Sequence, residues 1–185
     1  GFIILTNLDR IKNKIKRAPK GSLFILGDFS HLNIPYNTLK EYIRRLVKSG
    51  ELRLVYRGIY QKPKFNNKLN REVPASPSDI ANTYARKNNW KIVPSGDTAL
   101  NQLGLTTQVP NTYQYKSSGP NREIILKSGI KISFENTVSR EIDMEKTSAL
   151  VIEALKSIGE ENANDDVLKM ITDKLNQKDN TVGLL

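Results

Sequence analysis

The stretch from Asn33 to Lys62 constrains the fold more than any other part of the chain, because a helical repeat is followed there by a hairpin pattern. Asn33 is a suitable helix cap, Pro35 suits a first helical turn, and Gly50 is placed to end the helix. Between them, apolar residues recur at spacings of three and four, which is typical of a helix with one buried face. These residues are Leu39, Tyr42, Ile43, Leu46 and Val47.

A two-stranded hairpin is predicted directly after this helix. Leu52 to Tyr56 and Ile59 to Gln61 are rich in strand-forming residues, and Arg57-Gly58 between them is a turn signal. The helix face opposite the apolar stripe is polar and mostly cationic. It carries Asn37, Lys40, Glu41, Arg44 and Lys48, with Arg45 at its edge. The combination predicts the recognition helix and wing of a winged helix-turn-helix.

The cationic helix face has two interpretations. Charged residues must lie outside in any protein, so Lys40, Arg44 and Lys48 could form a solvated face without a partner. Asn, Lys and Arg are also the side chains that reach base edges and phosphates in a major groove. Glu41 is the one acidic residue named on this face. It could accept a hydrogen bond from a cytosine amine or pair with Arg45 four residues later.

The distribution of charge favours a polyanion as partner. The chain has 29 Lys and Arg against 19 Asp and Glu, a net charge of +10. Residues 1–75 hold 16 cations against 5 anions, a net of +11, whereas residues 141–185 hold 5 against 10, a net of −5. A uniformly basic chain could owe its charge to solubility alone. A basic front with an acidic tail instead indicates that a polyanionic partner binds the basic end.

Residues before the central stretch are predicted to complete the first domain. The apolar spacing predicts a helix from about Thr6 to Arg17, with Lys12 and Lys16 among the cations that cover its other faces. Ser22 to Leu26 is predicted to be a short strand, and Asp28 to cap a brief second helix. The order helix, strand, helix, helix, hairpin is the plan of a winged helix.

The remainder is predicted to form a linker and a second domain. Its predicted elements are a helix capped by Ser78 and Asp79, a strand at Trp90 to Val93, a helix ending at Gly104, strands at Thr112 to Lys116, Arg122 to Lys127 and Ile130 to Phe134, and helices at Thr147 to Ile158 and Asp165 to Leu175. The predicted fold class is α+β. A winged helix-turn-helix occupies residues 1–64, a linker rich in Pro, Asn and Ser occupies 65–78, and a mixed α/β domain with a small antiparallel sheet and C-terminal helices occupies 79–185.

We expect a protein that is not an enzyme and has neither a metal nor another cofactor. The chain has no cysteine, and His31 is its only histidine, so a usual zinc site is excluded. Ser95 has no histidine in its own domain to act as base. The glycine after the Trp90 to Val93 strand could cradle a phosphate, but it lacks the spacing of known phosphate loops, and a packing helix is the better explanation.

Two groupings that contain acidic residues are candidate catalytic sites. Glu123 and Lys127 face the same way on a predicted strand, but a nuclease pattern needs another spacing and an acidic residue upstream, for which Asp97 is the nearby candidate. Acidic residues also gather at a predicted helix start, where they could hold magnesium but are expected to complement the helix dipole. These are Glu141, Asp143 and Glu145.

The composition also bears on location. The lack of cysteine fits a reducing cytoplasm, and the chain has no run of about 18 apolar residues that could span a membrane. Phe2 to Leu5 is too short for the core of a signal peptide. We therefore expect a cytoplasmic protein.

Three segments carry a resemblance to a known family. They are IRRLVKSGEL at residues 43–52, the wing sequence RGIY with Lys62-Pro63, and PSGDTALNQLGLTTQVP at 94–110, continued by YQY and GPNR up to Arg122. In these segments the chain resembles the AbiEi-type antitoxins of type IV toxin–antitoxin (abortive infection) systems, in the branch with an N-terminal winged helix. The resemblance covers most of residues 8–160.

The resemblance implies a bacterial antitoxin that represses its own operon through the first domain. It also implies that the second domain neutralises a nucleotidyltransferase-like toxin, without a stable complex being required. The DNA-binding residues are then expected on the predicted helix, wing and first helix. Asn37, Lys40 and Arg44 would enter the major groove of operator DNA, Tyr36 and Lys48 would flank them, and Arg53, Arg57, Lys12 and Lys16 would contact phosphates.

Other functions remain open from the sequence. Residues 76–185 could be a protein-interaction module that opposes a toxin, with DNA binding as an accessory. The first domain could belong to a generic winged-helix transcriptional regulator, or its basic surface could bind RNA, although no aromatic strand motif supports RNA. A two-fold operator would pair two molecules on DNA, but no heptad repeat is visible.

Overall fold

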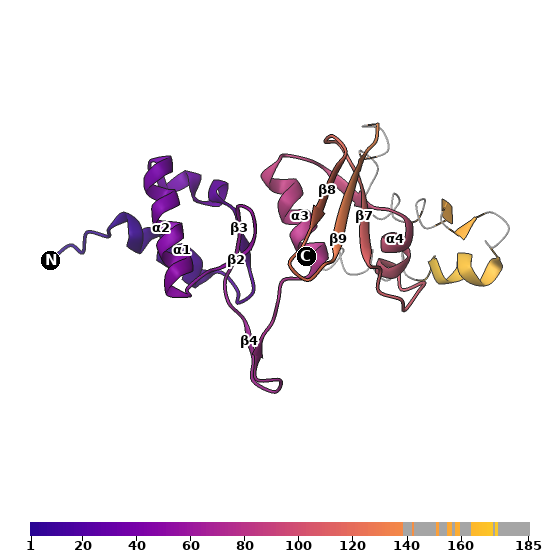
Figure 1. The fold of residues 1–185 in the computed structure, drawn as a ribbon, viewed down its shortest axis with the longest axis horizontal. Coiled ribbons are helices and arrows are strands. Elements are labelled where there is room, and N and C mark those ends of the chain that lie inside the picture. The colour runs from indigo at the N-terminus through magenta and orange to yellow at the C-terminus, as the bar shows by residue number, and fades with distance from the viewer. Residues whose placement is uncertain are drawn as a thin grey trace. The chain divides into compact units, whose positions relative to one another are not determined.

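The computed structural model describes residues 1–138, 142, 151, 155–156, 158–159, 164–171 and 173. The chain is mixed α/β, with helices and small sheets, as predicted. It divides into two compact units, Gly1–Lys87 and Asn88–Leu185, which are described separately below (Figure 1).

Helix α1 spans Asn7–Arg17, as its apolar spacing predicted. The Thr6 hydroxyl accepts a hydrogen bond from the Asp9 backbone N–H at 3.1 Å, and the Asp9 carboxylate accepts one from the Thr6 N–H at 3.0 Å. This reciprocal cap satisfies backbone donors that the helix start would otherwise leave free. Ile11 and Ile15 lie on the buried face of α1.

Strand β1 (Leu23–Phe24) leads into the 3-10 helix η1 (Leu26–Leu32). The helix starts earlier than predicted, with Ile25 as its N-cap, so the prediction that Asp28 is the cap residue is wrong. Asp28 lies at the third helical position, where its carboxylate accepts a hydrogen bond from the Ile25 N–H at 2.9 Å. Asn33 has a left-handed backbone, with φ at 52°, and ends η1. The prediction that Asn33 caps the following helix is therefore wrong. The short side chain of Asn tolerates the left-handed region that this abrupt change of direction requires.

Helix α2 spans Tyr36–Ser49 and begins directly after Pro35, which is its N-cap. It ends at Gly50 as predicted, because the left-handed backbone there (φ 83°) carries no steric cost for glycine. Its apolar stripe is turned inward. The buried residues of the stripe are Leu39, Ile43 and Leu46.

The predicted hairpin is present as β2 (Arg53–Tyr56) and β3 (Ile59–Gln61). Strand β3 is the middle strand of an antiparallel sheet in the order β1-β3-β2, in which Gln61 pairs with both Leu23 and Arg53. Gly58 supplies the positive φ, 75°, that the tight turn needs. The elements of this unit thus follow the predicted order.

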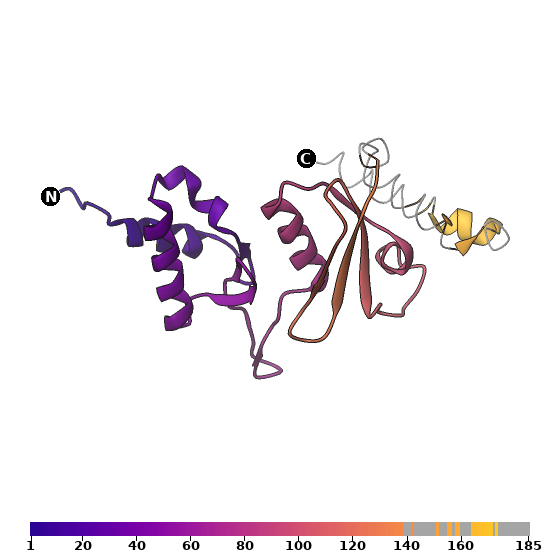
Figure 2. The same ribbon diagram turned by 45° about the horizontal axis from the view of Figure 1, so that its top comes forward.

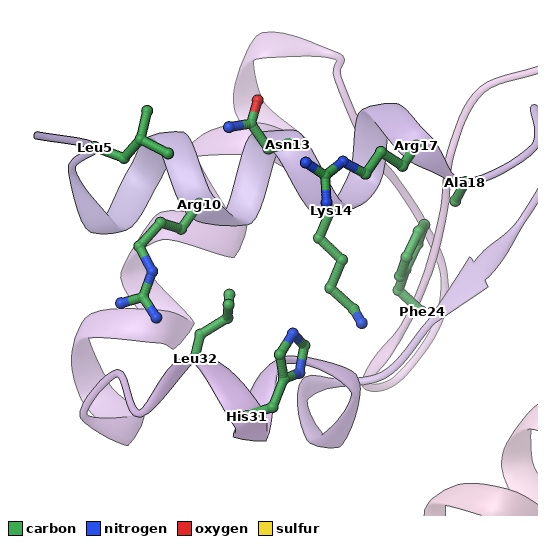
Figure 3. Close-up of a pocket in the computed structure, with 9 residues that line it drawn as sticks. All are labelled: Leu5, Arg10, Asn13, Lys14, Arg17, Ala18, Phe24, His31 and Leu32. Carbon is green, nitrogen blue, oxygen red and sulfur yellow. The ribbon is translucent and has the colours of Figure 1, made fainter. Parts of the chain in front are cut away.

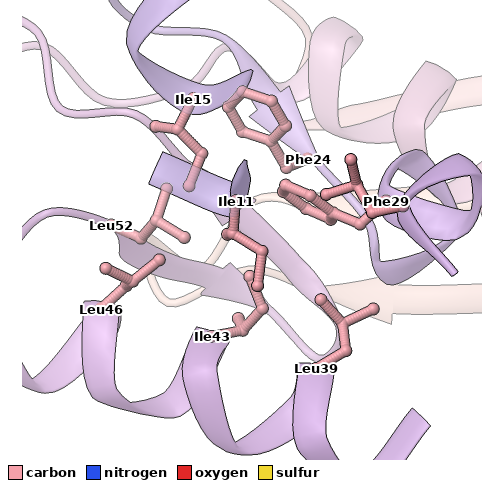
Figure 4. Close-up of a cluster of buried hydrophobic side chains, with 9 residues drawn as sticks. Ile11, Ile15, Phe24, Phe29, Leu39, Ile43, Leu46 and Leu52 are labelled. Carbon is pink, nitrogen blue, oxygen red and sulfur yellow. The ribbon is translucent and has the colours of Figure 1, made fainter. Parts of the chain in front are cut away.

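One apolar cluster holds these elements together (Figure 4). Its buried members are Ile11, Ile15, Phe24, Phe29, Leu32, Leu39, Ile43, Leu46 and Leu52. The Phe24 and Phe29 rings stack within it, with centroids 5.8 Å apart. Full burial of each such side chain contributes on the order of 1.5–3 kcal/mol, so the cluster is the main source of stability for the first unit.

Lys62 closes the C-terminal end of α1, a role that its sequence position did not predict. Its ammonium donates hydrogen bonds to the carbonyls of Ile15, Lys16 and Ala18 at 3.0, 3.0 and 2.7 Å. The last carbonyls of a helix have no partner inside it and carry the negative end of the helix dipole. Lys62, which follows β3, therefore ties the hairpin to α1.

The predicted linker is partly ordered. Residues Phe65–Asn66 (β4) and Arg71–Glu72 (β5) pair as a small antiparallel hairpin, which projects as an arm in both ribbon views (Figure 1 and Figure 2). Asn70 between the strands adopts a positive φ of 48°. Asn in the left-handed region lets the chain reverse, which explains how an Asn-rich segment forms a hairpin.

Helix α3 (Pro77–Lys87) belongs to the first unit, so the division falls after Lys87, later than the predicted linker. The Tyr84 ring meets the Tyr56 ring edge-on at 6.0 Å, and Arg86 pairs with Asp28 of η1. Proline at the first helical position explains where α3 begins.

The cap of α3 also differs from the prediction. The Ser76 hydroxyl accepts a hydrogen bond from the Asp79 N–H at 3.1 Å, so Ser76 supplies the cap that was expected from Ser78 and Asp79. Because the helix starts at Pro77, Ser78 and Asp79 already lie within its first turn. An acidic residue is still favourable there, since the helix start is electropositive.

The second unit contains a four-stranded sheet and a short helix. The strands are β6 (Ile92–Pro94), β7 (Thr112–Ser117), β8 (Arg122–Ile125) and β9 (Lys131–Asn136), and the helix is α4 (Gly96–Gln102). The order β6-β7-β9-β8 makes the predicted strand at Trp90 to Val93 an edge of this sheet. Ile92 pairs with Ser117 in that edge.

The prediction of a fully antiparallel sheet is wrong at one ladder. Strands β8 and β9 are antiparallel, but β9 inserts between β8 and β7 and pairs with β7 in parallel. Ile132 and Phe134 of β9 are almost completely buried, whereas Ile125 of β8 is 61% exposed. The strand with the better-buried side chains thus takes the central position, and the hairpin partner is left at the edge.

Only part of the predicted C-terminal region is described. Residues 151, 155, 156, 158, 165–171 and 173 are helical, within the segments where two helices were predicted. The remaining residues of those predicted helices, including Ala149, Ile152 and Leu175, lie outside the described residues. The acidic residues Glu141, Asp143 and Glu145 lie outside them as well.

Replacing Lys62 by Met should destabilise the protein, because the helix-end carbonyls would lose a charged donor while the side chain keeps its length. We expect the free energy of unfolding to fall by about 1.5–3 kcal/mol in urea titrations. The exposed Lys68 in the turn of the β4–β5 hairpin provides a matched control, and Lys68→Met should change stability by less than about 0.5 kcal/mol. Equal stabilities of the two variants would contradict the capping role of Lys62.

Candidate nucleic-acid interface

Helix α2 presents two faces with opposite character. Its buried stripe faces the core, and the predicted DNA-binding residues lie on the other side, exposed to solvent. These residues are Tyr36, Asn37, Lys40, Arg44 and Lys48. The packing of the stripe therefore determines which polar side chains of α2 are available to a partner.

A carboxylate organises the arginines of this face. Arg44 donates from Nε and Nη2 to the two oxygens of Glu41, at 2.9 and 2.8 Å, and Arg45 donates from Nε at 3.3 Å. Hydrogen bonding from Arg44, assisted by Arg45, lowers the pKa of Glu41 to about 2 and raises that of Arg44. Glu41 thus pairs with both arginines, where the sequence indicated Arg45, and holds Arg44 in a defined position.

The N-terminal part of the face has its own arrangement. The Lys40 ammonium lies over the Tyr36 ring, 5.7 Å from its centroid, and Tyr36 as a residue is 63% exposed. A lysine above an exposed ring is attracted by the negative face of the π-system. The pair adds a positive charge and a flat apolar surface at the start of α2.

Helix α2 and the hairpin together form a groove. A cavity of about 400 Å³ is lined by Asn37, Lys40, Glu41, Arg44, Val47, Leu54 and Tyr60. Leu54 comes from β2 and Tyr60 from β3, so the groove brings three predicted base-contacting residues beside the hairpin. Burial raises the pKa of Tyr60, whose hydroxyl remains neutral at physiological pH.

Arg53 of β2 is not free in this structure. Its Nε donates to a Glu72 oxygen at 3.1 Å, its Nη2 donates to the other, and its Nη1 donates to the Gly50 carbonyl at 3.1 Å. Hydrogen bonds from Arg53 lower the pKa of Glu72. A phosphate that engages Arg53 would have to compete with Glu72, which the sequence analysis had not placed at this site.

The turn of the β2–β3 hairpin is held by helix α3. The Arg57 side chain is exposed as predicted, while its carbonyl accepts a hydrogen bond from the Lys87 ammonium at 3.0 Å. A Cβ at Gly58 would come 2.6 Å from that ammonium. Lys87 therefore positions the hairpin turn, and no local sequence signal could have identified it, because 30 residues separate it from Arg57.

Lys12 and Lys16 of α1 are exposed but do not line the α2 groove. They line a second cavity of about 420 Å³ together with Lys20 and Lys62. Lys12 also lies 3.6 Å from a Glu51 oxygen. An exposed pair of this kind contributes little to stability and can be exchanged for another anion. The α1 cations thus form a separate basic surface of the first unit.

The residues considered for catalysis do not come together. Lys127 lies beyond the end of β8, and the Glu123 carboxylate pairs with Lys131 of β9 at 3.1 Å. Ser95 is buried, with its N–H donated to the Gln114 carbonyl. Within the described residues, His, Asp and Glu side chains form no group of three that could hold a metal ion.

No helix in the described part of the chain combines the length and the apolar character that a bilayer crossing requires.

The Glu41 pairing makes a direct prediction about titration. In the wild type, the pKa of the Glu41 carboxyl should be about 2, so the pair with Arg44 persists at neutral pH and is lost only as the pH falls toward that value. Arg44→Ala should move this pKa toward the ordinary glutamate value of 4.5, because the first of its stabilising donors is removed. Carbon-13 NMR of the carboxyl group measures it. Lys48→Ala on the same face should leave it unchanged, and a shift of equal size there would contradict the assignment.

Comparison with known proteins identifies one family. Its model matches residues 10–182, which includes both units. Comparison with curated proteins gave no match. Because the family model covers nearly the whole sequence, the chain belongs to DUF6088, a family of unknown function.

Proposed function

We propose that the first unit binds double-stranded DNA as a winged helix-turn-helix. The observation that carries this proposal is the exposed cationic face of α2 beside the β2–β3 hairpin. Asn37, Lys40 and Arg44 would read base edges in the major groove, with Tyr36 and Lys48 beside them. Arg57 at the wing tip would contact the phosphate backbone of the DNA.

Electrostatics supports DNA as the partner. Residues 1–75 carry 16 cations against 5 anions. Lys16 and Lys12 of α1 would add phosphate contacts, and each neutralised phosphate releases counterions and strengthens binding at low salt. Arg53 would join them only by exchanging Glu72 for a phosphate oxygen.

Glu41 gives the interface a way to discriminate among bases. A bidentate contact from Arg44 to guanine would require at least part of its pairing with Glu41 to be exchanged for the base. Glu41 could then accept from a cytosine amine, whereas a sequence without these groups would leave the carboxylate facing the negatively charged duplex. This cost at wrong sequences is a source of specificity.

We further propose that the protein is a cytoplasmic antitoxin of a type IV toxin–antitoxin system, without enzymatic activity. The proposal rests on the resemblance of residues 43–63 and 94–122 to AbiEi-type antitoxins. In it, the first unit represses the protein's own operon, and the second unit opposes a nucleotidyltransferase-like toxin. A stable complex between the two proteins is not required.

Two variants test the DNA-binding surface. Arg44→Ala should weaken binding to the operator by about 1–3 kcal/mol and relax base preference, because a base contact is lost. Lys16→Ala should weaken binding to all DNA sequences about equally. It should also reduce the slope of log affinity against log salt concentration by about one unit. Footprinting on the protein's own upstream region, followed by salt-titrated binding, measures both. Identical behaviour of the two variants would show that the groove-facing side of α2 is assigned incorrectly.

A full-length variant separates repression from neutralisation. Lys40→Ala combined with Arg44→Ala should abolish repression of a reporter under the protein's own promoter but still rescue growth when the neighbouring toxin is expressed. The reason is that the second unit carries the proposed antitoxin function. Loss of rescue by a well-folded variant would show that neutralisation depends on DNA binding, and failure of the wild type to rescue would remove the antitoxin proposal.

A further inference from the structure

A third concave site lies in the first unit, between α1 and η1. It is a cavity of about 510 Å³, which falls in the usual size range of small-molecule sites. Figure 3 shows Arg10 and Lys14 extending from α1, and His31 extending from η1, into the space between the two elements. The residues of the α2 groove do not line this cavity.

The polar part of the pocket is cationic. Arg10, Lys14 and Arg17 are spaced by four and three residues, which places them on one side of α1. All three line the pocket together with His31, and the described residues that line it include no carboxylate. Concentrating these charges is unfavourable unless an anion offsets their repulsion, so the pocket favours a negatively charged ligand.

Two of these side chains are already positioned. The Arg10 guanidinium donates to the Asn7 side-chain oxygen at 3.3 Å, and the Lys14 ammonium lies 6.0 Å from the centroid of the Phe29 ring. These contacts reduce the conformational freedom that a ligand would otherwise have to remove. The cations are therefore partly organised before binding.

The other part of the pocket is apolar. Phe24 and Leu32 are both buried, and Ala18 at the end of α1 lies beside them. A site for a bare inorganic anion would need no such surface. Cations opposite a small apolar wall suit a ligand with a phosphate at one end and a ring at the other.

We propose that the pocket between α1 and η1 binds an organic phosphate of the nucleoside monophosphate class. The phosphate would lie among Arg10, Lys14 and His31, and the ring would contact Phe24 and Leu32. The site differs from the proposed DNA interface and does not depend on it. Because His31 and Leu32 stand just before Asn33 and α2, a bound ligand would connect α1 to the segment that leads into α2.

Calorimetric titration of the full chain with adenosine monophosphate tests the proposal. At about 0.15 M salt, where long-range surface attraction is screened, binding should be saturable at one ligand per chain. Adenosine and inorganic phosphate should each bind about tenfold more weakly, because each keeps only half of the contacts. The His31 ring resonances should shift during the titration, and they are unambiguous because the chain has no other histidine.

Matched double variants locate the site. Arg10→Gln with Lys14→Met should weaken binding of adenosine monophosphate by about tenfold or more, since two charge-assisted contacts are lost. Arg71→Gln with Lys68→Met, in the exposed β4–β5 hairpin, removes the same charge and should leave binding within about twofold. If Arg10→Gln with Lys14→Met fails to fold, the proposal is tested by the binding of adenosine monophosphate to the milder variant Arg17→Gln. The shift of the His31 resonances in the wild type is then the second measurement.

Several results would overturn the proposal. They are the absence of saturable binding, equal binding of adenosine and its monophosphate, an unchanged His31 resonance, or equal weakening by both double variants. If the pocket only contacts DNA phosphates, any duplex DNA should displace the nucleotide. Inorganic phosphate should then bind as well as adenosine monophosphate, because the ring adds nothing. Each of these outcomes leaves the DNA-binding proposal for α2 standing, because that proposal rests on other residues.

Discussion

The inward packing of the α2 stripe is the interaction on which the rest of the first unit depends. Leu39, Ile43 and Leu46 enter the same cluster as Ile11 and Ile15 of α1. Rotating α2 by one residue would bring polar side chains into that cluster, at a cost of several kcal/mol for each unpaired polar group. The orientation of the cationic face is therefore a consequence of the core.

Charge pairing then decides what the exposed arginines can do. Arg44 and Arg53 are both held by carboxylates in bidentate or near-bidentate geometry, through Glu41 and Glu72. Such exposed pairs contribute little to stability, so exchanging them for phosphate or base contacts costs little. They do keep the guanidinium groups extended and oriented. Glu41 and Glu72 thus act on the same arginines that a DNA ligand would use.

Much of the first unit could be predicted because its signals are local. The bounds of α1, the end of α2 at Gly50 and the hairpin turn at Gly58 each follow from a side chain or a backbone preference within a few residues. The exposure of Asn37, Lys40 and Arg44 also follows from helical periodicity alone. Asn33 was misassigned because a residue suited to capping one helix equally suits the left-handed end of the helix before it.

The long-range partners were not predictable in the same way. Glu72 reaches Arg53 across 19 positions, and Lys62 reaches the end of α1 across more than 40. Sequence spacing carries no record of such approaches, since they depend on how hairpins and helices pack. The parallel insertion of β9 beside β7 has the same origin, because adjacent strands in sequence need not be neighbours in a sheet.

By itself, the sequence determined helices α1 and α2, the turns at Gly50 and Gly58, the mixed α/β class and the strongly basic character of the front of the chain, because these depend on local preference and composition. Tertiary structure alone decided that α3 joins the first unit, that Lys87 holds the turn of the β2–β3 hairpin, and that Arg10, Lys14 and His31 line one pocket. Those outcomes arise when distant segments bury their apolar surfaces together, and that burial places polar groups beside partners that the order of residues does not specify.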